Sequence, residues 1–305
     1  MMFVQAPPGS FDLLARAVCV ETNKTKSQCT IDHNTWAKEI GDYFSCKWKA
    51  KEGHNVQDLL VAGESQKLGL QGTDMLDLFS SIKNQCKMDA NGVSVYALRF
   101  VCVASPTQFA SCLELLLTRT DLCREQCING FVTGKGATTP LVSELRSIMP
   151  LPAVLQIADV LLANQMHCWV NSVLPCPPSC FEGAVKYTQP LDIAHGLALA
   201  IERGLDDRSH LAIAQADIRQ YYDSLDVPAL AWWLHLEGLN IAWASAIVRV
   251  QMVPAINLRA GEKSACVDAQ TSGSLTGNRV AGALGRIPVM QVLEQRAPLW
   301  EAVGY

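Results

Sequence analysis

An aspartate that follows a short apolar run needs a chemical explanation more than any other residue of the chain. Residues Leu211 to Ala216 have the length and composition of a strand that is covered on both faces, and Asp217 comes directly after them. A carboxylate at the end of a buried strand is costly unless it is paired or coordinates a metal ion. Asp217 therefore either binds a metal ion, or it forms a turn or caps a helix.

A second candidate element lies downstream, where small residues precede a helix. Thr271 to Gly277 consists mostly of Gly, Ser and Thr, and a helix-like run continues to about Arg296. Small residues let the backbone approach a ligand closely. The segment lacks the Gly-Lys-Ser/Thr ending of a P-loop and the GxGxxG pattern of a dinucleotide fold. A plain turn that caps the following helix is the alternative.

The stretch Ala216 to Leu225 resembles the first catalytic motif of reverse transcriptases. The resemblance implies that Asp217 is the catalytic residue that binds the magnesium ions. It also implies that Tyr222 lies under the sugar of the incoming nucleotide and that Ile218 contributes to the substrate site.

The segment around Gly277 resembles the second palm motif of the same family, which supports the template and the nascent base pair. Its order of strand, Gly/Ser turn and helix is similar to that motif, and Gly277 aligns with the glycine of the family. Thr276 stands where many members have glutamine, so it takes the place of a substrate-binding residue.

Segments upstream continue the resemblance. Lys135 lies in a Gly-Lys-Gly turn and Arg146 follows it, and together they resemble the fingers hairpin, where both cations would face the triphosphate. Cations suit that place because nucleotidyl transfer builds negative charge on phosphate oxygens. Ordinary solvated charges are the alternative. Residues from Trp36 to Leu98 resemble the segment before the fingers in non-LTR (LINE-type) retrotransposon polyproteins.

One catalytic element of that family is absent. Two-metal transfer needs several carboxylates that converge on the ions, and reverse transcriptases supply them with a paired-aspartate turn after the second palm motif. No Asp-Asp pair follows Gly277. The resemblance therefore implies an RNA-directed DNA polymerase fragment that is cut before this motif, belongs to a longer polyprotein and is inactive alone. The alternative is a non-catalytic relic or a nucleic-acid-binding module.

The composition suits a folded protein, and its charge is unusual for the partners that the resemblance implies, which are an RNA template, a DNA primer and deoxynucleoside triphosphates. Of 305 residues, 49% are apolar and 18% are charged, which favours a globular chain. The net charge of −4 is unusual for a nucleic-acid binder. Residues 244–296 are locally positive, with the cations Arg249, Arg259, Lys263, Arg279, Arg286 and Arg296.

Cysteine usage and hydropathy favour a nuclear or cytoplasmic protein without a membrane partner. Twelve cysteines in 305 residues are a lower cysteine density than that of small secreted disulfide scaffolds. No signal peptide is recognisable. The longest apolar block, Leu151 to Ala163, is too short to span a bilayer. Cys123 with Cys127, and Cys176 with Cys180, lack the usual spacing of zinc ligands, so reduced thiols are expected.

These elements predict an α+β fold, with the helix-rich fingers and partial palm of a right-hand polymerase and a small antiparallel palm sheet. We expect a linker or peripheral region over residues 1–72 and one fingers-palm unit over 73–305. Helices are expected around 73–87, 106–120, 151–170, 190–203, 227–237 and 241–252, and two strands over 251–259 and 263–270.

Overall fold

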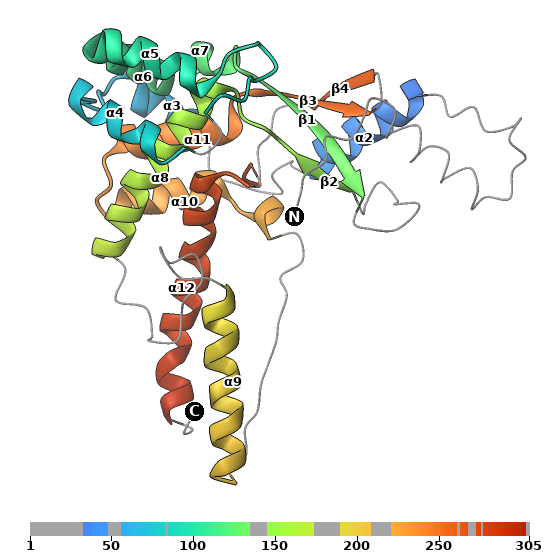
Figure 1. Ribbon diagram of the computed structural model, residues 1–305, viewed down its shortest axis with the longest axis vertical. Coiled ribbons are helices and arrows are strands. Elements are labelled where there is room, and N and C mark those ends of the chain that lie inside the picture. Colours follow the sequence, from blue (N-terminus) through green and yellow to red (C-terminus); the bar gives the residue numbers. More distant parts are fainter. Residues whose placement is uncertain are drawn as a thin grey trace, which may run out of the picture.

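The computed structural model describes residues 33–47, 56–82, 85–134, 145–173, 190–208, 221–260, 263–267, 273–275 and 277–302. This described part is helix-rich, at 67% helical, and contains one small sheet (Figure 1). The helices are α2 (His33–Lys47), α3 (Val56–Glu64), α4 (Gly72–Ser80), α5 (Val95–Ala104), α6 (Pro106–Thr118), α7 (Thr120–Arg124), α8 (Ala153–Val173), α9 (Pro190–Asp206), α10 (Val227–Leu236), α11 (Ile241–Met252), α12 (Arg279–Ala302) and the short 3-10 helix η2 (Tyr222–Ser224). The strands are β1 (Cys127–Gly134), β2 (Leu145–Ile148), β3 (Ala255–Ala260) and β4 (Lys263–Val267).

The four strands form a mixed sheet in the order β2-β1-β3-β4. Two pairs are antiparallel hairpins, β1 with β2 and β3 with β4, whereas β1 and β3 run parallel with Ile128 opposite Ile256. The expectation of an antiparallel sheet is therefore wrong. A hairpin has local turn signals, but a parallel pair joins strands that are distant in sequence, so neither strand carries a mark of the other.

The helices begin and end near the expected residues because their caps are local. Asp226 accepts a hydrogen bond from the backbone N–H of Ala229 at the start of α10, and Gly238 has a φ of +105° just after it. Helix α4 ends at Ser80, earlier than expected, and the side-chain amide of Gln85 donates to carbonyls at this end, those of Phe79 and Ile82.

The turn at Asp89 joins two parts of the helical body. One carboxylate oxygen accepts from the N–H groups of Asn91 and Val93, and the other accepts from Ala153 at the start of α8, at 2.9 Å each. Gly92 has a φ of +74°, a backbone conformation that is strained for residues with a side chain. One carboxylate thus shapes its own turn and caps a helix that begins at Ala153.

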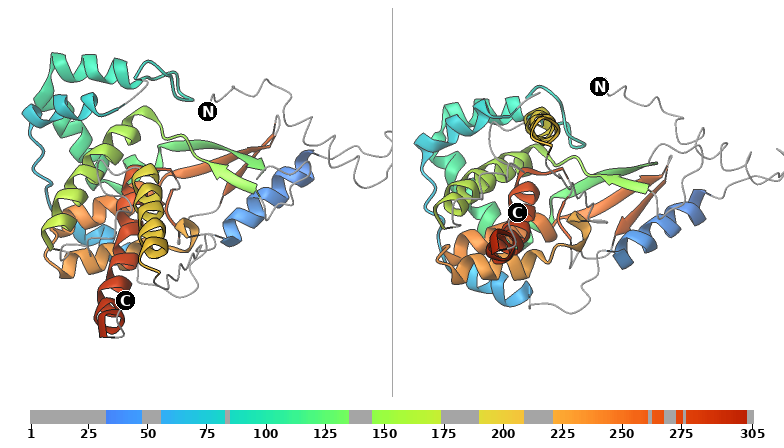
Figure 2. Two further views of the ribbon diagram at one scale, coloured as in Figure 1. Left: turned by 60° about the horizontal axis from the view of Figure 1, so that its bottom comes forward. Right: turned by 90° about the horizontal axis from the view of Figure 1, so that it is seen from below.

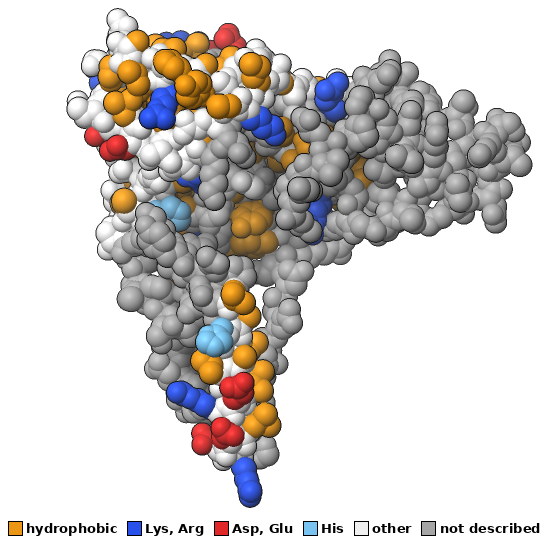
Figure 3. Space-filling view, in the orientation of Figure 1, with side chains coloured by type: hydrophobic (Ala, Val, Ile, Leu, Met, Phe, Trp, Pro, Cys, Tyr) orange, Lys and Arg blue, Asp and Glu red, His pale blue; other side chains and the backbone are white. Residues whose placement is uncertain are grey.

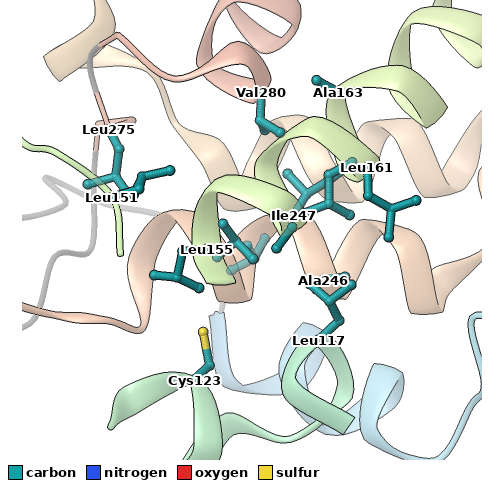
Figure 4. Close-up of a cluster of buried hydrophobic side chains, with 14 of the residues drawn as sticks. Leu117, Cys123, Leu151, Leu155, Leu161, Ala163, Ala246, Ile247, Leu275 and Val280 are labelled. Atoms are coloured by element: carbon teal, nitrogen blue, oxygen red, sulfur yellow. The ribbon is translucent and has the colours of Figure 1, made fainter. Parts of the chain in front are cut away.

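The main core lies where α8 and α11 meet the first turns of α12. Figure 4 shows Leu155 and Leu161 of α8, Ile247 of α11 and Val280 of α12 in this cluster. Nearly every residue of α11 is buried, so this helix is the centre of the body. Burial on all sides fits its mostly apolar sequence, and its polar residues Ser245, Arg249 and Gln251 are buried as well.

The sheet extends to one side of the helical body, with α2 packed along β3 and β4 (Figure 2). The peripheral helix α3 packs against α11. The division of the chain at residue 72 stays a prediction.

Helix α12 runs from the core out of the body (Figure 1). The described side chains of α9 are almost all exposed. Apolar side chains of α5, among them Phe100, Val101 and Val103, are also exposed. Figure 3 shows hydrophobic side chains gathered at the top of the molecule, where α5 lies in Figure 1. Within the described ranges, no helix is both long enough and apolar enough to span a bilayer.

Candidate functional site

The segment that follows the predicted metal-binding aspartate contacts the segment that precedes α12. The N–H of Ser274 donates to the carbonyl of Tyr222, and the N–H of Gly273 donates to the carbonyl of Leu225, both at 2.8 Å. A Cβ at Gly273, whose φ is +80°, would lie 3.0 Å from the carbonyl oxygen of Asp223. Glycine therefore permits the contact that joins the two motif-like segments.

Two tyrosines fix this junction to the side of α12. The rings of Tyr221 and Tyr222 lie 5.6 Å apart in an edge-on arrangement, and the Tyr221 hydroxyl donates to the carbonyl of Gly285. A Cβ at Gly285 would lie 3.1 Å from Tyr221 Cε1 and 3.2 Å from Tyr222 Cε1. Burial raises the pKa of Tyr221, and the neighbouring Tyr222 adds to the rise, so the hydroxyl stays protonated as a donor.

A buried carboxylate caps the N-terminus of α12. Asp159 of α8 is 5% exposed, and its two oxygens accept from the N–H groups of Arg279 at 2.9 Å and Val280 at 3.1 Å. Burial raises the pKa of this carboxyl, while the two N–H groups and the Arg279 charge oppose that rise. The guanidinium of Arg279 in turn donates to the hydroxyl and the carbonyl of Ser81, after α4.

A cleft of about 440 Å³ opens beside this helix terminus. It is lined by Ile82, Ile148, Met149, Pro150, Leu151, Gln156, Asp159, Val160, Gly277, Asn278 and Arg279. The lining comes from Ile82 after α4, from the end of β2 and the loop after it, from α8, and from the turn before α12. Its apolar residues lie mainly in the segment 148–151, and the turn before α12 contributes Gly277, Asn278 and Arg279.

Buried polar atoms cluster in and under the turn before α12. Gln251 Oε1 accepts from the N–H of Leu275 at 2.9 Å, which holds the turn on α11. Gln251 Nε2, Ser274 Oγ and Asn278 Nδ2 are buried, and in the described structure none of them has a hydrogen-bond partner. Of the three residues, Asn278 is the one that lines the cleft.

The structure brings together some of the residues predicted from the motifs. Gly277 lines the cleft with a φ of +93°, and Tyr222 begins η2 on the other side of the Gly273 contact. Arg146 is exposed on β2, two residues before Ile148 in the cleft wall, and is not itself part of the lining. Asp217, Ile218, Lys135 and Thr276 lie outside the described residues.

The positive segment 244–296 is less available to a ligand than its sequence indicates. Arg249 is completely buried and Arg286 is 7% exposed, whereas Arg259 and Arg279 are exposed. Arg249 donates to backbone carbonyls inside the body. A count of charges along the sequence therefore overstates the positive surface.

Motif analysis missed Asp159, Gln156 and Asn278, which line the cleft. Asp159 had a usable signal, because it is the one charged residue in the apolar block Leu151 to Ala163. An acid inside an apolar helical run must be buried with partners or lie on an exposed stripe. Gln156 and Asn278 have no comparable signal.

Within the described residues, the cysteines do not form a metal centre. The described residues contain no group of three or more His, Cys, Asp or Glu that could hold an ion. The thiol of Cys123 is buried and contacts the carbonyl of Arg249, and burial raises its pKa to about 12. Cys127 Sγ instead accepts from the amide of Asn257. Cys176 and Cys180 lie outside the described residues.

Comparison of the sequence with models of protein families and with curated proteins found no match.

Proposed function

We propose that this chain is the fingers and partial palm of a reverse transcriptase of the non-LTR (LINE-type) class, and that it binds an RNA template with a DNA primer. The observation that carries the proposal is the pair of backbone hydrogen bonds between Tyr222–Leu225 and Gly273–Ser274. Two segments that resemble catalytic motifs, far apart in sequence, lie in contact. Such contact is what an active site assembled from both motifs requires.

The lining of the cleft suits one unit of a nucleic acid strand. Met149, Pro150 and Leu151 give the lining an apolar stretch, in which Pro150 is exposed, and a base can pack against it. Arg146 is an exposed cation on the strand that leads into the cleft, where it can pair with a phosphate.

Asp217 is the one residue that we propose as a magnesium ligand. The described residues do not fit a two-metal site by themselves, since they hold no cluster of potential ligands. The segment Tyr221–Leu225 contributes a single carboxylate, that of Asp223, which is too few for such a site. The described residues therefore bind and position the nucleic acid, and bound magnesium would stabilise charge on the phosphate and the primer oxygen.

Binding to template and primer tests the proposal directly. We expect saturable binding of a fluorescein-labelled RNA template annealed to a DNA primer, measured by fluorescence anisotropy at low salt. Affinity should fall as salt rises, because each phosphate contact releases counterions. Arg146→Glu should raise the Kd about fivefold or more, since a lost contact becomes a repulsion.

A matched charge reversal separates this effect from net charge. Arg124→Glu changes the charge equally at an exposed residue of α7 that does not line the cleft, and it should change the Kd by less than about twofold. Equal losses in both variants would point to nonspecific attraction. No binding by the wild-type chain would overturn the proposed function.

Primer extension should be absent with the 305-residue chain. With magnesium and deoxynucleoside triphosphates, we expect no lengthened primer on a denaturing gel, because the second set of metal-binding carboxylates is missing from the sequence. Extension that disappears in Asp217→Ala would contradict this expectation and would show that other carboxylates complete the site.

A further inference from the structure

The side of α5 that faces solvent is almost entirely apolar. Cys102 is buried against the body, whereas Phe100 is 61% exposed, Val103 58% and Tyr96 45%. Arg99 is the single charged residue of this helix. A surface helix normally turns its polar residues outward, so α5 has the reverse of the usual pattern.

Most exposed apolar residues of α5 lie side by side on one face. Successive residues of an α-helix are turned by about 100°, so the exposed residues within about one third of the circumference are Tyr96, Ala97, Phe100, Val103 and Ala104. We call these five residues the outer face. The rings of Tyr96 and Phe100 meet edge-on at 4.9 Å, so this part of the face is packed before any partner binds.

Two further apolar side chains extend the outer face at the N-terminal end of α5. Met88 is 69% exposed and Val93 is 36% exposed in the turn before the helix, where Met88 pairs with Ser94. With these exposed fractions the patch covers roughly 600 Å² per chain, which is at the upper end of what monomers expose and approaches the 800 Å² per partner of a standard interface. A patch of this size indicates an interaction surface.

The order of large and small residues on the outer face matches a second copy of the same face. In an antiparallel pair with a two-fold axis at Phe100, Tyr96 meets Ala104 of the other copy, because both lie four residues from Phe100. Val103 meets Ala97 in the same way. A large side chain thus lies opposite a small one in each of these contacts, which lets the two helices approach closely. The two Phe100 rings meet at the axis.

The charges of α5 permit this pairing. Arg99 lies outside the outer face, and the face itself contains no charged residue. Two copies therefore meet without burying a charge and without placing like charges opposite each other. A charged partner would lose hydration here and gain no ion pair on the face, so an identical apolar face is the better match.

We propose that the outer face of α5 is a dimer interface, in which α5 pairs antiparallel with α5 of a second copy around a two-fold axis at Phe100. The inference goes beyond the proposed function and does not depend on it, since no residue of α5 lines the cleft. A small interface of this kind corresponds to a Kd of the dimer in the micromolar range.

Sedimentation equilibrium of the full chain tests the proposal. We expect a mass of 33.2 kDa at low concentration and twice this mass at about 100 μM, well above a micromolar Kd. A reducing agent is present throughout, because the exposed thiols of Cys86 and Cys112 would otherwise cross-link chains. A monomer at about 100 μM would overturn the proposal and would leave the outer face to a different partner.

Phe100→Glu should raise the Kd of the dimer about a hundredfold or more, because two carboxylates would meet at the axis. Leu236→Glu is the matched control, since Leu236 is 69% exposed at the end of α10 and lies outside the outer face. It should leave the Kd within about twofold of the wild type. A Phe100→Glu variant that dimerises like the wild type would contradict the proposal. Circular dichroism checks the fold, and Val103→Glu, with the same expected weakening, replaces Phe100→Glu if that variant loses its helical signal.

A charge exchange tests the antiparallel register. Tyr96→Lys and Ala104→Glu should each weaken the dimer, whereas Tyr96→Lys/Ala104→Glu places an ammonium opposite a carboxylate of the other copy, twice per dimer. We expect this double variant to dimerise about tenfold more tightly than either single variant. Tyr96→Lys/Ala97→Glu carries the same charges at residues that the antiparallel pair keeps apart, so it should stay as weak as the single variants. Recovery in this control alone would indicate parallel helices and overturn the proposal, as would the absence of recovery in both double variants.

Discussion

Arg249→Met is expected to lower the free energy of unfolding by about 3 kcal/mol. Arg249 lies in the middle of α11, is 0% exposed, and donates to the carbonyls of Leu117 and Leu60, the latter at 3.0 Å. Its Nε reaches the hydroxyl of Thr120 at 3.3 Å. Leu117 belongs to the last turn of α6, where carbonyls lack helical partners. Methionine fills a similar volume and leaves these acceptors unsatisfied.

The guanidinium network also reaches a carboxylate at the surface. Glu64 Oε1 accepts from the hydroxyl of Thr120 at 2.6 Å, and this bond is the main reason why the pKa of Glu64 is lowered. Burial lowers the pKa of Arg249, but an arginine keeps its charge at any pH that a folded protein survives. The network therefore joins α3, α6, α7 and α11 around one cation.

Urea denaturation followed by circular dichroism measures the effect of Arg249→Met. Arg124→Met, which removes an exposed cation on α7, should stay within about 0.5 kcal/mol of the wild type. Arg249→Lys should recover only part of the loss, because an ammonium cannot reach three acceptors with the planar fork of arginine. An unfolding free energy of Arg249→Met within about 1 kcal/mol of the wild type would show that the network adds little.

Local chemistry explains why much of the helical framework could be predicted from the sequence. Asp226 with Pro228 starts α10, and Gly238 ends it, because a cap acts within one turn of the chain. The hairpin of β3 and β4 follows from two short strand-like runs around a turn. Capping residues and turn residues lie within or next to the element that they start or end, so they can be recognised in the sequence.

The remaining architecture depends on contacts between distant residues. Nothing in β1 marks β3 as its parallel neighbour, so the mixed sheet could not be predicted. In the sequence, Arg249 belongs to a positively charged stretch. In the structure it is buried, because carbonyls of α3 and α6 accept hydrogen bonds from its guanidinium. A charge in a sequence does not tell whether it faces solvent or a set of carbonyls.

Some residues of the candidate site could be predicted from sequence motifs, and others depend on contacts between distant residues. Motif resemblance drew attention to Tyr222 and Gly277, and the segments that hold them come together through Gly273. Asp159 and Asn278 belong to no motif, and their relation depends on how α8 meets α12. Whether Asp217 binds a metal stays a prediction, because it lies outside the described residues.

Gly63→Ala is expected to lower the free energy of unfolding by about 2 kcal/mol. Gly63 lies in α3 where the backbone meets α11, and a Cβ there would lie 2.1 Å from Ser245 Cβ and 2.2 Å from Ser245 Oγ. Both positions are buried, so the added methyl group can fit only if the two helices separate. The better helix propensity of alanine, about 1 kcal/mol, offsets part of this cost.

Gly196→Ala provides the control for propensity alone. Gly196 lies in α9, and a Cβ at this residue would have no other atom within 4 Å, so alanine there should leave stability unchanged or raise it by up to about 1 kcal/mol. If Gly63→Ala behaved like Gly196→Ala, the close approach of α3 and α11 would be wrong.

A reciprocal exchange tests the contact itself. Ser245→Gly removes both atoms that the new methyl group would meet, and it removes a buried hydroxyl that has no hydrogen-bond partner among the described residues. The double variant Gly63→Ala/Ser245→Gly should therefore be more stable than the sum of the two single changes, by about 1 kcal/mol or more. Strict additivity in urea denaturation would mean that the helices relieve the clash elsewhere. A favourable coupling would identify the Gly63–Ser245 crossing as the point that fixes α3 on the central helix.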